Sequence, residues 1–324
     1  MTLNRRGALA AIASSALWQA PAFASDWPSR PIRLVWPFAT GGLGANLTRV
    51  LGDGLSQRLG QPVVIDPKPG AGGVLGFQYT KQATPDGYTI MLGTNSTSTL
   101  LPSMQKNLPF DPLKDFEHIG MAYTSGNVIV VRADSDIKSL KDLRDKAKAN
   151  PGKLTYGSAG NGSTYHLMPA LFDQLNGTQM LHVPYRGGGP AYLGLLSGEV
   201  DVVFGDLSAL PQVQAGKMRA LGVTSRQRVP AAPEIPTTAE LGMPELLMES
   251  FYGLFAPKGT PKPIIDRLST EMAAVLATPT VQRQLETLST QAAPDTSPAY
   301  FVKRIREEAA RWKPVIDKAG ITIE

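Results

Sequence analysis

The stretch "LTYGSAGNGSTYHLMPALF", from Leu154 to Phe172, changes character twice. A short β-type run comes first, glycine and small polar residues follow, and an apolar pattern of helical spacing ends the stretch. This is the order of a strand, a loop and a helix, and glycine lets the backbone of such a loop approach a bound group closely. The same order recurs along the chain, so the sequence predicts an α/β fold with a mostly parallel sheet.

The first predicted strand is "IRLVWPF", from Ile32 to Phe38, a continuous apolar run of the kind that central parallel strands show. A helix is predicted after it, because apolar residues recur at spacings of three and four from Leu47 until Gly60. Further strands are predicted at residues 62–66, 88–92, 128–132, 154–158, 180–185, 200–204, 218–225 and 252–257.

The pattern changes after Pro257, where three helices are predicted with no strand between them, at residues 261–276, 281–288 and 298–318. The last helix carries a broad apolar stripe, which we expect to pack back onto the first lobe. The length of 324 residues favours two lobes over one. We predict two chain crossings, near Gly126 and Ser250. The predicted domains are lobe 1, residues 25–125 plus 251–324, and lobe 2, residues 126–250.

The first 24 residues have the pattern of an export signal. Arg5 and Arg6 form its positive region, a short alanine-rich segment follows, and the small residues around Phe23 predict cleavage after Ala24. The paired arginines favour the twin-arginine route, and the general secretory route stays open. Pro21 argues against an ordinary N-terminal helix. We therefore expect a soluble periplasmic protein.

Composition narrows the function. The chain has no cysteine and only three histidines, so we predict no disulfide, no thiol nucleophile, no metal site and no cofactor. The net charge is +5, and loss of Arg5 and Arg6 leaves +3. Basic and acidic residues alternate as on an ordinary solvated surface, which disfavours nucleic acid as a partner.

Four glycine-rich loops are predicted at the carboxyl ends of strands, at residues 37–42, 68–76, 157–164 and 184–190. In open α/β sheets ligands bind at this edge, where helix N-termini present unpaired N–H groups. The loops therefore predict a cradle for an anion, although glycines that only form turns remain the alternative. Hydroxyl groups that can cap a helix or bond a ligand come from Thr40, Ser158, Ser163 and Thr164.

Other chemistries have less support. No loop has the spacing of a P-loop or a complete dinucleotide fingerprint. A hydrolytic enzyme would need Ser163, His166 and Asp206 together, and no nucleophile elbow surrounds Ser163. Asp206 is expected to cap a helix, with a ligand contact as the alternative. Arg186 is either a carboxylate clamp or a solvated loop charge.

Several segments together, including "WPSRPIRLVWPFATGG", "PDGYTIMLG", "NPGKLTYGSAGNGSTYHL" and "HVPYRGGGPA", resemble the extracytoplasmic substrate-binding proteins of tripartite tricarboxylate transporters, the Bug family. The resemblance covers the whole mature chain. It implies a type II periplasmic-binding-protein fold, with two doubly wound α/β lobes around a cleft. It also implies a receptor that binds a small organic carboxylate through backbone N–H groups, hydroxyls and water, without chemistry, and passes it to membrane subunits. We expect a monomer; a sensory or orphan receptor and an α/β hydrolytic enzyme are the alternatives.

The resemblance also carries over a set of ligand-binding residues. Two positions depart from the family pattern. Ala45 stands where aspartate is usual, and Pro169 lies in a helix that usually lacks proline there, so we expect some distortion of that helix. The predicted ligand-binding residues are Phe38, Thr40, Gly41, Gly42, Thr94, Asn95, Ser158, Ala159, Gly162, Ser163, Thr164, Gly187, Gly188 and Asp206.

Overall fold

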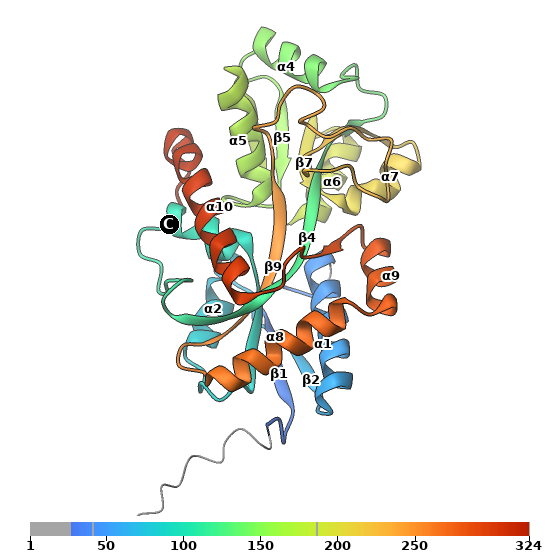
Figure 1. The fold of residues 1–324 in the computed structure, drawn as a ribbon. Coiled ribbons are helices and arrows are strands. Elements are labelled where there is room, and N and C mark those ends of the chain that lie inside the picture. The colour runs from blue at the N-terminus through green and yellow to red at the C-terminus, as the bar shows by residue number, and fades with distance from the viewer. Residues whose placement is uncertain (1–26, 41, 186, 324) are drawn as a thin grey trace, which may run out of the picture.

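A single long strand, β4 (Phe116–Arg132), connects the two halves of the molecule in the computed structural model (Figure 1). The structure describes residues 27–40, 42–185 and 187–323, so the predicted export signal, Gly41 and Arg186 lie outside the described residues. The strand order is β2-β1-β3-β9-β4-β7-β5-β6, and β8 and β10 also pair with β4. Strand β4 therefore belongs to the sheets of both halves.

The partners of β4 change along its length. Up to Gly126 it pairs with β9 and β10, and from Asn127 onward it pairs with β7 and β8. We call lobe 1 the half with the first pairings and lobe 2 the half with the second. The change supports a crossing near Gly126, while the full division into domains stays a prediction. Lobe 1 contains β1 (Ile32–Trp36), β2 (Val63–Pro67), β3 (Thr89–Thr94), β9 (Glu249–Pro257) and β10 (Gln291–Ala292); lobe 2 contains β5 (Thr155–Ser158), β6 (Leu181–Pro184), β7 (Val202–Asp206) and β8 (Met218–Val223).

The sheet is mixed, and the prediction of a mostly parallel sheet is wrong for its centre. Strands β1, β2 and β3 are parallel, and so are β5, β6 and β7, but every ladder that involves β4 or β9 is antiparallel. The reason is topological. Strand β4 takes the chain from lobe 1 into lobe 2 and β9 takes it back, so these neighbours must run in opposite directions.

Helices cover both faces of each lobe. In lobe 1 they are α1 (Gly42–Leu59), α8 (Lys262–Leu276) and α9 (Pro279–Thr287) on one face, with α2 (Val74–Lys81) and the start of α10 (Pro298–Ala319) on the other. In lobe 2 they are α4 (Leu140–Ala149) and α5 (Thr164–Asn176) on one face, with α6 (Gly188–Ser197) and α7 (Leu210–Gln214) on the other. Short helical turns are η1 (Ala71–Gly73), η2 (Ser96–Leu100), α3 (Leu101–Met104) and η3 (Leu207–Ala209).

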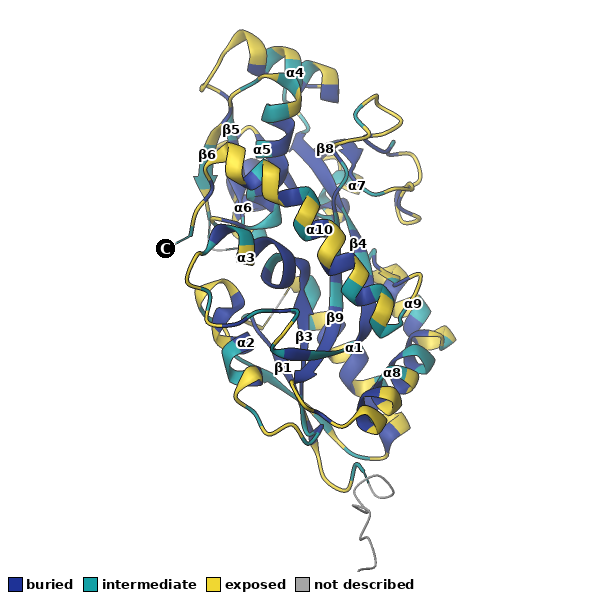
Figure 2. Cartoon of the chain, turned by 60° about the vertical axis from the view of Figure 1, so that its left-hand side comes forward, coloured by how far each residue is buried: buried dark blue, intermediate teal, exposed yellow. Residues whose placement is uncertain are grey.

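Helix α10 packs on lobe 1, as the sequence predicts, and its second half also packs on lobe 2. Phe301 lies in the core of lobe 1, whereas Trp312 and Ile316 lie in the core of lobe 2 against α5. The side chain of Gln174 on α5 donates to the carbonyl of Val315 at 2.8 Å. Figure 2 shows exposed and buried residues alternating along α10. A helix of 22 residues is about 33 Å long, more than one lobe covers.

Two strands and one helix differ from the sequence prediction. The first half of β4 and the two-residue β10 were not predicted, because their mixed polar sequence has no clear period. Helix α5 continues through Pro169 as one element, although proline leaves the carbonyl of Tyr165 without its helical N–H partner. Among the residues that the structure describes, no helix has the length and apolar character needed to cross a bilayer.

Candidate functional site

Strand direction brings the glycine-rich loops of both lobes to one boundary. Strand β3 is antiparallel to β9, which runs from lobe 2 to lobe 1, so β1, β2 and β3 end facing lobe 2. Strand β7 is antiparallel to the second half of β4, so β5, β6 and β7 end facing lobe 1. Helices α1, α5 and α6 begin just after β1, β5 and β6. Three helix N-termini therefore open at the boundary, where their free N–H groups favour an anion.

On lobe 1, the loop after β2 packs against the loop after β1. Gly73 has a φ of 101°, and a Cβ there would lie 2.5 Å from Cγ2 of Thr97 and 3.1 Å from Cζ of Phe38. Phe38 is half-buried and lies 5.1 Å from Trp36 between ring centroids. Thr40 is exposed, as is Gly42 at the start of α1. Gly73 was not among the predicted site residues, although its glycine-rich loop was.

The segment after β3 is held by its own hydroxyl groups. Thr94 is 8% exposed, and its hydroxyl lies 2.8 Å from the hydroxyl of Ser96. Ser98 donates from its hydroxyl to the carbonyl of Thr94 at 2.8 Å, and Thr97 does so at 3.0 Å. Asn95, 3% exposed, precedes the π-helical turn η2. The predicted residues Thr94 and Asn95 thus lie at the boundary but are largely enclosed.

On lobe 2, the side chains of the loop after β5 bond mainly within the loop. Ser158 is fully buried, and its hydroxyl accepts from the backbone N–H of Gly160 at 3.1 Å. The hydroxyl of Ser163 donates to the carbonyl of Gly160 at 2.7 Å and makes no capping bond to α5. Ala159 and Thr164 are half-buried. What the loop offers to a ligand is therefore chiefly backbone, including the first N–H groups of α5.

Two histidines support this loop from behind. The rings of His166 and His182 stack at 3.8 Å between centroids, and Tyr156 stacks on His182 at 5.0 Å. Nε2 of His182 lies 2.6 Å from the hydroxyl of Ser158, and Nδ1 of His166 accepts from the N–H of Gly162 at 3.2 Å. Burial, and secondarily the neighbouring His166, lowers the pKa of His182 to about 4, and burial also lowers the pKa of His166. Both imidazoles are therefore neutral at pH 7.

Asp206 lies where the two lobes meet. Its carboxylate accepts from the N–H of Ser208 at 2.9 Å, which confirms the predicted helix cap, on η3. In the ladder between β3 and β9, Thr94 of lobe 1 lies opposite Tyr252. Burial raises the pKa of Tyr252, and the carboxylate of Asp206 raises it further. Thr94 thus pairs with Tyr252 in the ladder, and the charge of Asp206 from the other lobe acts on the same tyrosine.

Tyr165 lies at this boundary but is not among the ligand-binding residues predicted from the sequence. Its side chain is 6% exposed, and its hydroxyl lies near Tyr192 and Asp206 but makes no hydrogen bond of normal geometry with the described residues. A Cβ on Gly188 would lie 2.5 Å from this hydroxyl, so the group lies at the N-terminus of α6. Burial raises the pKa of Tyr165, with Asp206 as a further cause. In the sequence Tyr165 belongs to the apolar pattern of α5, and nothing there indicates an unpaired donor.

The structure also shows the surroundings of Gly162 and of the residues that a hydrolase would need. Gly162 is buried, and a Cβ there would lie 2.4 Å from Cδ1 of Ile323 and 3.0 Å from the sulfur of Met104, so this glycine faces α3 and the C-terminal end rather than open space. The hydrolase arrangement is not assembled. His166 receives the N–H of Gly162 rather than the hydroxyl of Ser163, and Asp206 caps η3. Gly187, with a φ of 121°, and Gly188 are half-buried.

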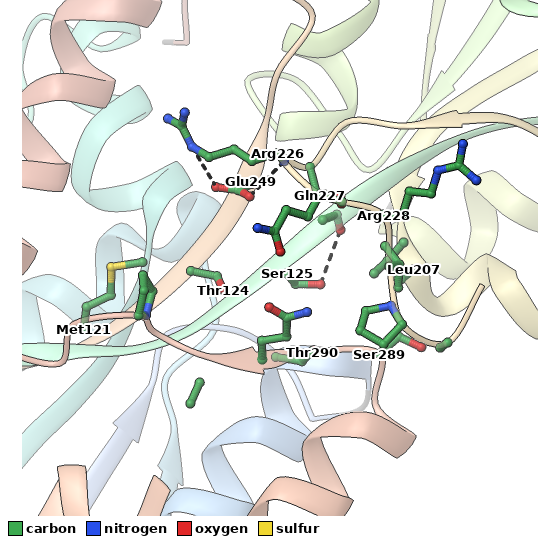
Figure 3. A pocket seen from close by; sticks show the side chains of 18 of the residues that line it. Met121, Thr124, Ser125, Leu207, Arg226, Gln227, Arg228, Glu249, Ser289 and Thr290 are labelled. Carbon is green, nitrogen blue, oxygen red and sulfur yellow. Dashed lines mark hydrogen bonds and ion pairs between the residues drawn. The ribbon is translucent and has the colours of Figure 1, made fainter. Parts of the chain in front are cut away.

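A separate cavity lies beside the crossing of β4 and β9 (Figure 3). Its volume is about 750 Å³, and it is lined by β4, the segment after β8, the β10 region and α10. None of the predicted ligand-binding residues that the structure describes lines it. We place the candidate carboxylate site at the loops, because cavity size alone does not indicate the ligand, whereas three helix N-termini do.

The fold and the facing loops define a two-lobed periplasmic binding protein. The structure of the periplasmic binding protein BugD superposes with a TM-score of 0.82 at 33% identity, covering 92% of this chain and 100% of that one. A structure of Rpa4515 from R. palustris with adipate gives 0.84 at 32% identity, covering 92% and 99%. These neighbours confirm the predicted type II fold.

The family follows from the sequence comparisons. Residues 47–321 match the model of the tripartite tricarboxylate transporter family receptor. Protein BugT of Bordetella pertussis is 33% identical over 316 residues, covering 94% of each chain. This chain belongs to that receptor family, and its Bug-type resemblance is confirmed. The relatives are solute-binding proteins rather than enzymes, and they are periplasmic.

Proposed function

We propose that this protein is a periplasmic receptor that captures a small organic carboxylate between the facing loops and delivers it to the membrane subunits of a tripartite tricarboxylate transporter. Membership of the receptor family and the adipate-bound neighbour support this function. The observation in the site that carries the proposal is the buried hydroxyl of Tyr165 beside the start of α6, which has only Tyr192 and Asp206 as polar neighbours and makes no hydrogen bond of normal geometry with the described residues. Burial of such a donor costs free energy unless a ligand oxygen accepts its hydrogen bond.

In this proposal the ligand carboxylate accepts backbone N–H groups at the starts of α5 and α6, and Tyr165 donates from its hydroxyl. Lobe 1 contributes the start of α1 and the loops around Phe38 and Thr94. A ligand that touches both lobes stabilises the orientation in which they are close, so closure follows from its bonds to the two sides. The ligand-binding roles of the predicted residues remain part of this proposal.

We propose no chemical conversion of the ligand. Ser158 and His182 form the one serine–histidine contact near the loop that resembles a nucleophile with its base. Among the described residues the ring of His182 has only Ser158 as a hydrogen-bond partner, so no carboxylate orients it as in a catalytic triad. We also propose a monomer that is exported with cleavage after Ala24. N-terminal sequencing of the periplasmic fraction should begin at Ser25, and a full-length cytoplasmic product would contradict this.

The test is calorimetry with a library of small dicarboxylates and their diamides. The acids should bind and the diamides should not, because an amide lacks the charge that the helix N-termini favour. Tyr165→Phe should weaken the best acid about tenfold, the value of one hydrogen bond of about 1.4 kcal/mol. Tyr79→Phe, which removes a surface hydroxyl that accepts from Arg33, is the matched control. Equal binding of acid and diamide would refute the anion site.

A further inference from the structure

The cavity beside the β4–β9 crossing has the size and chemistry of a second binding site. Its volume of about 750 Å³ lies within the range of about 300–1,000 Å³ typical of small-molecule sites. Its walls come from lobe 1, from lobe 2 and from β4 where it passes between them. Figure 3 shows Arg226 and Glu249 on one side of this space and Leu207 and Ser289 on the other.

One wall carries a buried guanidinium group with an unused donor. Arg304 is 7% exposed, and its Nη2 donates to Glu308 at 3.1 Å, but its Nε has no partner among the described residues. Arg226 lines the same cavity and lies 3.8 Å from Glu249 in a loose ion pair. An unsatisfied donor on a buried cation indicates a missing acceptor, and a carboxylate is the acceptor that a guanidinium binds best.

The charges around these arginines are mixed. Arg311, further along α10 and not among the residues that line the cavity, has its pKa lowered by burial, and the positive charges of Arg226 and Arg304 lower it further, while Glu308 and Glu249 oppose this. Arg228, in contrast, is held by both carboxylate oxygens of Glu240 at 3.0 Å and is already paired. Glu286 and Glu307 also line the cavity, and Glu307 lies 4.0 Å from Nη1 of Arg304. The attraction for an anion therefore comes from the free Nε of Arg304 and from Arg226, rather than from an excess of positive charge.

The rest of the lining offers neutral hydrogen-bonding groups. Ser289 has a φ of 50°, a left-handed conformation that is uncommon outside glycine and recurs at functional sites. Gln227 is exposed and contributes an amide. The cavity is also lined by residues with hydroxyl groups, which are Thr124, Ser125, Ser225, Ser289 and Thr290.

We propose that this hinge cavity binds a second small molecule, a hydroxycarboxylate, with its carboxylate against Arg226 and Arg304 and its hydroxyl groups against the serine and threonine side chains. The site is separate from the loops of the proposed function, because none of the loop residues predicted to bind ligand lines it within residues 27–40, 42–185 and 187–323. Its walls belong to both lobes, so its occupancy is linked to their relative orientation and thereby to binding at the loops.

The test is equilibrium dialysis of the mature chain with radiolabelled malate, counted as molecules bound per chain at saturation. Gln227→Trp should fill the cavity and remove one bound malate, and Arg226→Gln should weaken that site at least tenfold. The matched controls are Gln57→Trp and Arg283→Gln, which lie on the exposed faces of α1 and α9 and should bind as the wild type does. Circular dichroism melting checks the fold of each variant.

The outcomes separate this proposal from the proposed function. The hinge site is supported if the cavity variants bind one malate fewer per chain than the wild type while Tyr165→Phe keeps that malate. This holds whether or not the loops bind malate as well. If wild type and Gln227→Trp bind equal amounts of malate, or if the wild type binds none, the hinge site is refuted. Neither result affects the calorimetric test of the loops, in which the binding of dicarboxylates is compared with that of their diamides.

Discussion

The segment after β3 in lobe 1 is braced by hydroxyl groups, whereas the loop after β5 in lobe 2 is braced by imidazoles. In lobe 1, Thr97 and Ser98 donate to the carbonyl of Thr94, and none of these groups titrates near neutral pH. In lobe 2, His182 contacts Ser158 and His166 accepts from Gly162. Two loops at the same boundary can therefore differ in their response to pH, since only the loop of lobe 2 depends on neutral histidines.

The largest effect is expected in lobe 1, from Gly73→Val. The φ of 101° is unfavourable for a branched residue and costs about 1–3 kcal/mol, and the new Cβ would lie 2.5 Å from Thr97 in a packed loop. Ligand affinity should fall about a hundredfold or more by calorimetry. Gly72→Val is the matched control, because Gly72 has a φ of 63° but no atom within 4 Å of its Cβ position. Equal losses of affinity in both variants would mean that the backbone strain of the substitution causes the loss, and not the clash with Thr97.

A smaller loss is expected in lobe 2 from Gly162→Val. Its φ of 73° is also unfavourable, but the clash is with the ends of the Met104 and Ile323 side chains, which can move. The variant should lose about tenfold in affinity and remain folded by circular dichroism. Gly152→Val, at a distant turn with a φ of 71° and open space around it, should leave binding unchanged. Wild-type affinity for Gly162→Val would remove this loop from the site.

The pH dependence of stability tests the imidazole bracing. The pKa of His182 is about 4 in the folded protein, below the ordinary value of 6.5, so the unfolded chain binds the proton first as the pH falls. The free energy of unfolding should therefore decrease from about pH 6.5 towards pH 4, where the folded form also takes up the proton. The pKa of His118, buried in lobe 1, is likewise about 4 and adds in the same direction.

Binding separates these two histidines. Ligand affinity should weaken as the pH approaches 4, because a protonated imidazole disturbs the loop after β5. His182→Phe keeps a stacked ring and should reduce this acid sensitivity, whereas His118→Phe should leave it unchanged. Calorimetric titrations between pH 4 and 7 measure both. An identical acid profile in the wild type and His182→Phe would show that the imidazole does not support the loop.

The smallest effects are expected from removing one hydroxyl in each lobe. Ser158→Ala leaves the N–H of Gly160 and the ring of His182 without their shared partner and should cost about 1–2 kcal/mol of binding. Thr94→Val should cost about 0.5–1 kcal/mol, because Ser98 still donates to the carbonyl of residue 94. If Thr94→Val lost more binding free energy than Ser158→Ala, the segment after β3 would depend more on its hydroxyl than the loop after β5 does, contrary to this expectation.

The sequence by itself determined the local order of strands, loops and helices. Most strands appear where apolar runs predict them. The glycine-rich loops follow the carboxyl ends of strands, and this order could be predicted because it depends only on neighbouring residues in the sequence. The cap at Asp206 was predictable for the same reason. The motif resemblance also gave the receptor family, since it depends only on residue order.

Only the tertiary structure decided which distant surfaces meet. Periodicity indicates that one face of α10 is buried, but not that Val315 meets Gln174 of the other lobe. It places Ser158 and Tyr165 near a loop, but the direction of each side chain depends on His182 and on Gly188, which lie far along the chain. The shared strand β4 likewise depends on pairing with β9, more than a hundred residues later. Such contacts arise from packing between separate segments, and no pattern within one segment encodes the partner that it will meet.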